Sequence, residues 1–157
     1  MTELTIARAL HVLAVVHWIG GVFMVTAVIL PSVARLAEPE RRIALFESIE
    51  GAFSWQAKIS VTLAGATGFY MTARLDAWSR FLDPAYWWMH AMVAVWALFT
   101  FVLFVAEPLF LHQWFRRAAA RDPAATFALI QRFHWALLTA SLVTIGAAVL
   151  GAHGALG

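Results

Sequence analysis

The residues best suited to chemistry in this sequence are six histidines that lie in or beside apolar stretches. Ionisable side chains inside membrane segments are costly to bury and mark functional sites by default. His11 and His90 stand out, because each follows the start of a long apolar stretch by a few residues. Imidazole is a common axial ligand of haem iron. The pair therefore raises the hypothesis of a b-type haem clamped between two helices, with a structural hydrogen bond as the alternative for each ring.

The elements that carry these histidines have the length and composition of membrane helices. Of the 157 residues, 62% are hydrophobic and 13% are charged, whereas soluble domains average about 45–50% and about 25%. A helix needs roughly 20 apolar residues to cross a bilayer. Four stretches qualify, at about residues 9–34, 53–73, 85–113 and 133–152. We therefore predict an all-α fold, an integral membrane four-helix bundle that forms a single transmembrane domain.

The distribution of Lys and Arg predicts how this bundle is oriented. Most of the basic residues fall in or beside the connectors that follow the first and third spans. By the positive-inside rule these connectors lie in the cytoplasm. We therefore expect a multi-pass protein of the bacterial cytoplasmic (inner) membrane with both termini in the periplasm. The basic residues on the cytoplasmic side are Arg35, Arg41, Arg42, Lys58, Arg116, Arg117, Arg121 and Arg132.

Helix geometry predicts that several histidines lie at a matched depth. The first and third spans run in the same direction, and at 1.5 Å per residue His11 and His90 lie roughly 5–8 Å below the outer boundary. His153 returns to that side at the end of the fourth span, and His17 lies near the middle of the first. We expect His11 and His90 to ligate the haem iron, with His153 or His17 as substitutes.

The wall of the haem pocket is expected to come from aromatic residues and glycines of the first and third spans. Trp18 and Gly21 are the candidates on the first span, although plain helix–helix packing is the more common reason for glycine at such a position. The sequence contains no cysteine. This excludes disulfides, thiolate zinc sites, iron–sulfur clusters and covalently attached c-type haem.

A carboxylate inside the third span marks a second candidate site, on the cytoplasmic side. Glu107 is followed by Pro108, which has no N–H to donate and so frees the carbonyl of Phe104. His134 could reach a similar depth from the fourth span. We expect Glu107 and His134 to handle protons or a quinone, and a buried Glu bonded to a hydroxyl or to the freed carbonyl is the alternative. Lys58 is expected to extend to the headgroups.

Copper is the competing interpretation of the outer histidines. Met71, Met89 and Met92 lie at the depth of His90, and thioether and imidazole groups together suit copper, with sulfur favouring Cu(I). Methionine at such positions also commonly fills gaps in a hydrophobic core. The methionines alone therefore do not separate a copper site from ordinary packing.

The stretch "ARALHVLAVVHWIGGVFMVTAVILP" resembles the first helix of the CopD/HemJ-like superfamily of small integral membrane proteins. The shared features are His11, Trp18, the Gly20–Gly21 pair and Pro31. HemJ-type members are haem-associated protoporphyrinogen oxidases, and CopD members are linked to copper uptake, so the resemblance implies either haem or copper. Where HemJ-type members carry a lysine after the third-span histidine, this chain has Met92. The four-helix build is also similar to cytochrome b561-type proteins, which exchange electrons with quinol.

We therefore predict a haem b-binding membrane protein of redox chemistry and electron transfer, with quinone or quinol as a candidate partner. The alternatives are a copper-handling membrane protein, a HemJ-like protoporphyrinogen oxidase and a non-catalytic assembly subunit. The lipid bilayer is the expected surrounding, a second copy of the chain is a candidate partner, and no nucleic acid is expected. Whether the protein is an enzyme, such as a membrane oxidoreductase, stays open at this point.

Overall fold

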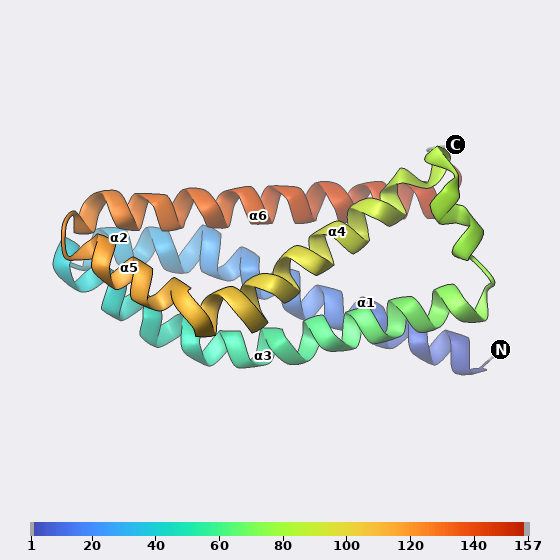
Figure 1. Cartoon of the computed structure of the whole chain (residues 1–157), viewed down its shortest axis with the longest axis horizontal. Coiled ribbons are helices and arrows are strands. Elements are labelled where there is room, and N and C mark those ends of the chain that lie inside the picture. The colour runs from blue at the N-terminus through green and yellow to red at the C-terminus, as the bar shows by residue number, and fades with distance from the viewer. Residues whose placement is uncertain (1, 156–157) are drawn as a thin grey trace.

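The computed structural model describes residues 2–155, which form four long helical rods lying side by side (Figure 1). No strand occurs within this range. The first rod contains α1 (Thr2–Met24), the π-helical η1 (Val25–Ile29) and α2 (Leu30–Leu36), and the second rod is α3 (Pro39–Arg74). The third rod contains α4 (Trp87–Phe101), the π-helical η4 (Val102–Leu111) and α5 (His112–Ala119). The fourth rod is α6 (Pro123–Ala152). Two short 3₁₀ helices, η2 (Trp78–Leu82) and η3 (Pro84–Tyr86), join the second and third rods.

The rods extend beyond the apolar stretches from which spans were predicted. The second rod begins at Pro39 and not near residue 53, and the fourth begins at Pro123 and not near residue 133. Both start with proline in the first turn, where its missing N–H costs nothing. Asp122 caps the fourth rod, its side chain accepting a 2.9 Å hydrogen bond from the N–H of Ala125. A hydropathy criterion finds only the apolar part of each helix, so it misses these polar first turns.

Three of the four rods are long and apolar enough to cross a membrane: Thr2–Leu36, Pro84–Ala119 and Pro123–Ala152. The second rod has the required length but is not among them. Its predicted span includes polar residues such as Ser54, Gln56 and Lys58. The second rod is therefore the polar member of the bundle.

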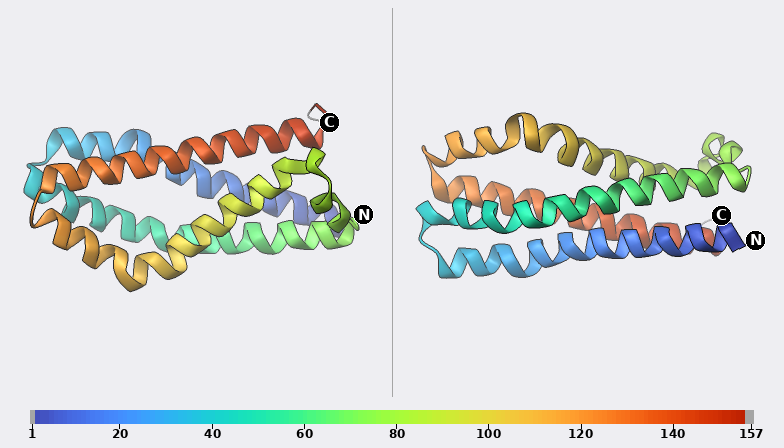
Figure 2. Two further views of the ribbon diagram at one scale, coloured as in Figure 1. Left: turned by 45° about the horizontal axis from the view of Figure 1, so that its top comes forward. Right: turned by 90° about the horizontal axis from the view of Figure 1, so that it is seen from below.

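The two basic connectors lie together at one end of the molecule. Figures 1 and 2 show the α2–α3 and α5–α6 connections at one end, and both ends of the chain at the other. We call the connector end the basic end. Its arginines are Arg35, Arg41, Arg42, Arg116, Arg117 and Arg121.

Aromatic rings lying on glycines bring neighbouring rods into contact. A Cβ on Gly21 would overlap the ring of Phe53, so the first and second rods meet there without a side chain between them. A Cβ on Gly65 would likewise overlap the indole of Trp96, whose Nε1–H donates a 2.9 Å hydrogen bond to the carbonyl of Val61. Glycine is therefore required at both positions for the rods to approach this closely.

The third rod is bent, and the bend brings it against the second. Figure 1 shows α4 starting beside the end of α6, crossing diagonally to α3, and the chain then turning back along α5 toward α6. The left view of Figure 2 shows the bend within η4, where Pro108 cannot donate a backbone hydrogen bond. Proline and π-helical turns are established causes of helix kinks. The bend therefore sets the position of Glu107, the residue before this proline.

We predict that Gly65→Ala destabilises the fold by about 1–3 kcal/mol, the usual cost of overpacking a core. The added methyl group would displace the Trp96 ring and break its bond to Val61. The matched control is Gly146→Ala, because no atom lies within 4 Å of a Cβ there; it should be neutral or stabilising by about 0.5–1 kcal/mol. Thermal unfolding in detergent measures both. Equal melting temperatures for the two variants would contradict the packing described.

Candidate functional site

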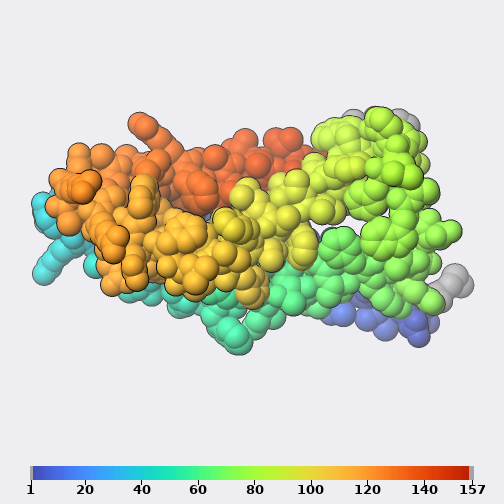
Figure 3. All heavy atoms as spheres, in the orientation of Figure 1, coloured from blue at the N-terminus to red at the C-terminus, as the bar shows by residue number. Residues whose placement is uncertain are grey.

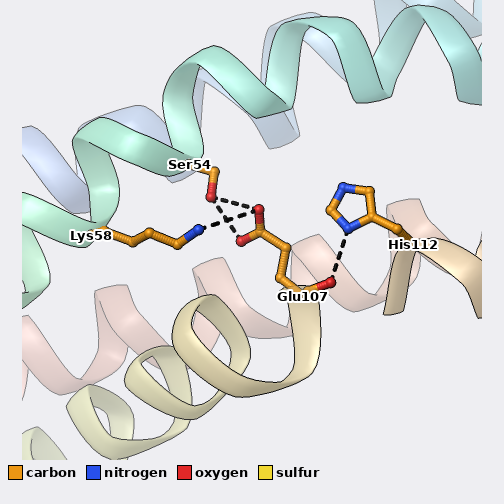
Figure 4. A network of polar contacts seen from close by, with 4 residues as sticks. All are labelled: Ser54, Lys58, Glu107 and His112. Atoms are coloured by element: carbon orange, nitrogen blue, oxygen red, sulfur yellow. Dashed lines mark hydrogen bonds and ion pairs between the residues drawn. The ribbon is translucent and has the colours of Figure 1, made fainter. Parts of the chain in front are cut away.

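Glu107, in the π-helical part of the third rod, is held by two residues of α3 (Figure 4). The hydroxyl of Ser54 lies 2.7 Å from both carboxylate oxygens of Glu107. The ammonium group of Lys58 lies 3.7 Å from Oε1. Ser54 is buried, and the side chains of Glu107 and Lys58 are 14% and 30% exposed. The carboxylate is therefore largely removed from solvent and is compensated by one hydrogen bond donor and one cation.

His112 is positioned by the same π-helical turn. Its Nδ1 lies 3.0 Å from the backbone carbonyl oxygen of Glu107, five residues earlier (Figure 4). A carbonyl can only accept, so Nδ1 carries a hydrogen, and in the neutral ring Nε2 is left with a lone pair. His112 is thus available to accept a proton close to the Glu107 carboxylate.

Glu107 and His112 line a partly open cavity in the half of the bundle nearer the basic end. The cavity has a volume of about 80 Å³ and an otherwise mainly apolar wall. This is room for a few water molecules, and is well below the roughly 300–1,000 Å³ of pockets for drug-sized ligands. The second, third and fourth rods contribute its polar lining, which consists of Glu47, Glu50, Ser54, Glu107, His112 and His134.

The carboxylates of Glu47 and Glu50 are in an unfavourable setting for negative charge. Glu50 lies before the predicted second span, and burial raises the pKa of its carboxyl to about 7; the nearby carboxylates of Glu107 and Glu47 act in the same direction, against His112. One oxygen of Glu47 is buried without a hydrogen bond partner, although Arg116 lies 4.0 Å away. Glu50 is therefore a cavity carboxyl group that can carry a proton near neutral pH.

Trp18 forms part of the cavity wall nearer the centre of the bundle. The residue is only 4% exposed, and its indole N–H has no hydrogen bond acceptor within the described part of the chain. Its ring packs edge-on against Phe99, with centroids 4.8 Å apart. Buried donors in folded proteins are nearly always paired. The unpaired Trp18 N–H is therefore an unusual feature of this part of the bundle.

The structure places Glu107 and His134 in the lining of one cavity. His134 has its Nδ1 2.9 Å from the carbonyl of Ile130, one turn earlier on α6, and its ring packs edge-on against Phe46. The bent third rod and the long fourth rod together make this meeting possible. The two residues proposed for proton handling thus share one space.

His11 and His90 bind to different parts of the molecule. His11 contacts the second rod, with Nδ1 2.9 Å from the carbonyl of Ala64 and 3.1 Å from the hydroxyl of Thr67. His90 is exposed, and its Nε2 lies 3.0 Å from the carbonyl of Phe81 in the connector before α4. Over residues 2–155 no hydrogen bond or ring contact joins the two histidines. A shared haem would require His90 to release Phe81 or to use Nδ1.

The other expected haem-site residues have separate neighbours as well. His17 is exposed, with Nδ1 2.8 Å from the hydroxyl of Ser60, and His153 bonds back to the carbonyl of Val149 at the end of α6. The open side of Gly21 is filled by the Phe53 ring. In the region described, no three His, Asp or Glu side chains lie close enough together to hold a metal ion.

The methionines of the copper hypothesis are partly used in packing. Met89 is buried in a hydrophobic cluster with Trp88 and Ala147, and Met92 packs against the same cluster. Both thus occupy positions in which methionine commonly fills a core.

Sequence reasoning missed Glu47, Glu50 and Ser54 as site residues. The segment that contains the two glutamates lies before the predicted second span, whereas in the structure it is the first part of α3. A usable signal was present, because Glu47, Glu50, Ser54 and Lys58 recur at intervals of three or four residues and so follow one face of a helix. Extending the helix back to Pro39 would have connected this polar face with Glu107.

Neither a scan against protein-family models nor searches of curated proteins and of solved structures finds a match to this chain. The CopD/HemJ-like resemblance therefore stays a prediction. The functional argument rests on the geometry of the cavity.

We predict that Glu50 titrates near pH 7, well above the ordinary value for Glu of about 4.5. Because burial disfavours the charged form, the carboxyl group should keep its proton at pH 6 and lose it through pH 7 and above. The infrared C=O band of a protonated carboxyl group reports this directly, and Glu50→Gln should remove the band. Glu3, whose side chain is 77% exposed, supplies the control variant Glu3→Gln. A band that titrates near pH 4.5, or one that persists in Glu50→Gln, would overturn this assignment.

Proposed function

We propose that the protein is an integral membrane redox protein in which Glu107 exchanges protons between a quinol and the basic end of the bundle. One observation carries this proposal. Glu107, which is held by Ser54 and Lys58, lines the same cavity as further carboxyl and imidazole groups. Three apolar rods support insertion in a bilayer. In this proposal the second rod is the fourth span, with the polar face that begins at Ser54 turned toward the third rod.

The cavity residues have separate roles in proton transfer. Glu107, bonded by Ser54 and paired with Lys58, is the carboxylate placed to accept a proton from a quinol hydroxyl group. His112 and His134 each have a ring nitrogen free to pass a proton on, and a few cavity waters would join these groups. Glu50 and Glu47, nearer the basic end, complete the route. By the positive-inside rule this end faces the cytoplasm of a bacterial cell.

A b-type haem is the proposed electron carrier, and His11 is the observation that favours it. A histidine that ligates a metal usually donates its other ring N–H to a carbonyl, a carboxylate or water. His11 has this arrangement, because its Nδ1 bonds to the Ala64 carbonyl on another rod and Nε2 stays free. Haem bound there would accept and release single electrons.

We predict that Glu107→Gln lowers quinol oxidation about 10²-fold, the lower range for losing a general base. The reaction is measured in vesicles containing the protein, with ferricyanide as the electron acceptor. The amide keeps the size of the side chain but cannot take a proton. Glu3→Gln, at the opposite end, should keep the wild-type rate. A Glu107→Gln variant as active as Glu3→Gln would contradict the role of Glu107.

We predict that the purified protein shows a reduced b-type haem spectrum and that His11→Ala abolishes it. The His11→Ala change removes the imidazole that would ligate the iron. His153 is exposed and bonds only to a carbonyl one turn earlier, so it should be dispensable for haem binding. His153→Ala is therefore the control, and the haem-to-protein ratio is the measurement. Full haem content in His11→Ala would rule out His11 as a ligand.

A further inference from the structure

A second hollow lies on the outside of the bundle, between α3 and α4. Its volume is about 350 Å³, and its walls include Ala66, Phe69, Trp96 and Phe104. On the face shown in Figure 3, the atoms of α4 and η4 lie across those of α3. We call this hollow the α3–α4 groove. Because it lies on the outside of the bundle, in a membrane it would be open to the hydrocarbon core and not to water.

The α3–α4 groove is apolar even where hydroxyl groups line it. Thr62 and Thr100 both belong to its wall, and each hydroxyl donates a 2.8 Å hydrogen bond to a carbonyl one turn earlier in its own helix. The Trp96 N–H is similarly occupied by the carbonyl of Val61. With these donors satisfied internally, the groove fits a hydrocarbon chain and offers no donor to a polar molecule.

One face of α3 connects the α3–α4 groove with the internal cavity. Ser54, Lys58 and Thr62 are spaced four residues apart and therefore follow one another along this face. Ser54 lines the cavity and Thr62 lines the groove. Lys58 stands between them, paired with Glu107. The ion pair thus lies where a ligand in the groove would present its head group.

Charge limits which head group can lie beside this ion pair. Besides Lys58, the nearby charged groups on the cavity side are the carboxyls of Glu107, Glu50 and Glu47, with His112 and His134. A phosphate or a fatty-acid carboxylate would meet three carboxyl groups and two cations, which are Lys58 beside Glu107 and Arg116 beside Glu47. A neutral head group whose oxygen atoms accept a hydrogen bond from the Lys58 ammonium meets no such repulsion.

We propose that the α3–α4 groove holds the hydrocarbon tail of a quinone, with its head group at Lys58 and Glu107. This assignment rests on the proposed function and specifies its substrate as a tailed, neutral quinone. In the oxidation step, the quinol gives up two electrons one at a time to a one-electron acceptor, which is ferricyanide in the vesicle assay. Its two hydroxyl protons leave in turn through the Glu107 carboxylate to the cavity and the basic end, and the product is the quinone.

The test fills the groove without touching the ion pair. Ala66→Trp places a large ring in the groove from an exposed position, and Ala140→Trp makes the same change at an exposed alanine of α6 that lines neither space. The probes are decylubiquinone, which has a ten-carbon tail, and tail-free ubiquinone-0. We expect Ala66→Trp to weaken decylubiquinone binding about tenfold and to leave ubiquinone-0 binding unchanged. Ala140→Trp should bind both probes like the wild type.

Lys58→Met provides the complementary measurement, because it should weaken the binding of both probes. Equal decylubiquinone affinity in Ala66→Trp and Ala140→Trp would overturn the assignment of the groove. The assignment would also be overturned if native mass spectrometry found that Ala66→Trp loses a bound phospholipid while its quinone binding stays unchanged. If Glu107→Gln still slows quinol oxidation, either result would leave the proposed function in place. Failure of the groove assignment can therefore be distinguished from failure of the proposed function.

Discussion

The burial of one carboxylate, Glu107, is the constraint on which the arrangement of this bundle depends. A charged group taken out of water is strongly destabilising unless it is paired and hydrogen bonded. The partners of Glu107 come from another rod, because Ser54 and Lys58 both belong to α3. This accounts for two irregular features together. The second rod is more polar than the other three, and the third rod bends at η4, where it brings Glu107 against the second.

The packing elsewhere keeps this polar centre largely buried. Rings lying on Gly21 and Gly65 hold the first and third rods close to the second. Phe99 and Trp18 close the cavity toward the middle of the bundle. The cavity is consequently separated from the end that holds the termini and lies nearer the basic end. In such a low-dielectric setting, charges interact more strongly than they do in water. The ion pair and the hydrogen bonds at Glu107 are therefore stronger than they would be at a solvent-exposed site.

The sequence was sufficient to predict the helical class, the number of rods and the clustering of arginines at one end, because these follow from composition and local periodicity. It was insufficient for the pairing of side chains between rods. His11 and His90 were expected at one depth, yet depth says nothing about rotation around a helix axis, and their rings bind Ala64 and Phe81 instead. The meeting of Glu107 with Ser54 depends on the bend at Pro108. The proline was visible in the sequence, but the direction of the bend was not.

The account predicts that the cavity beside Glu107 exchanges water and protons with the basic end. The chain has no cysteine, so a single cysteine at Ala57, a buried cavity-lining position, can be labelled without background. The most direct measurement is the rate at which Ala57→Cys reacts with Ag⁺, a thiol-reactive, membrane-impermeant cation small enough for a cavity of about 80 Å³, added to either side of reconstituted vesicles. Reaction from the side of the basic end alone is the predicted result. A thiol that reacts from neither side, or only from the side of the termini, would contradict the account.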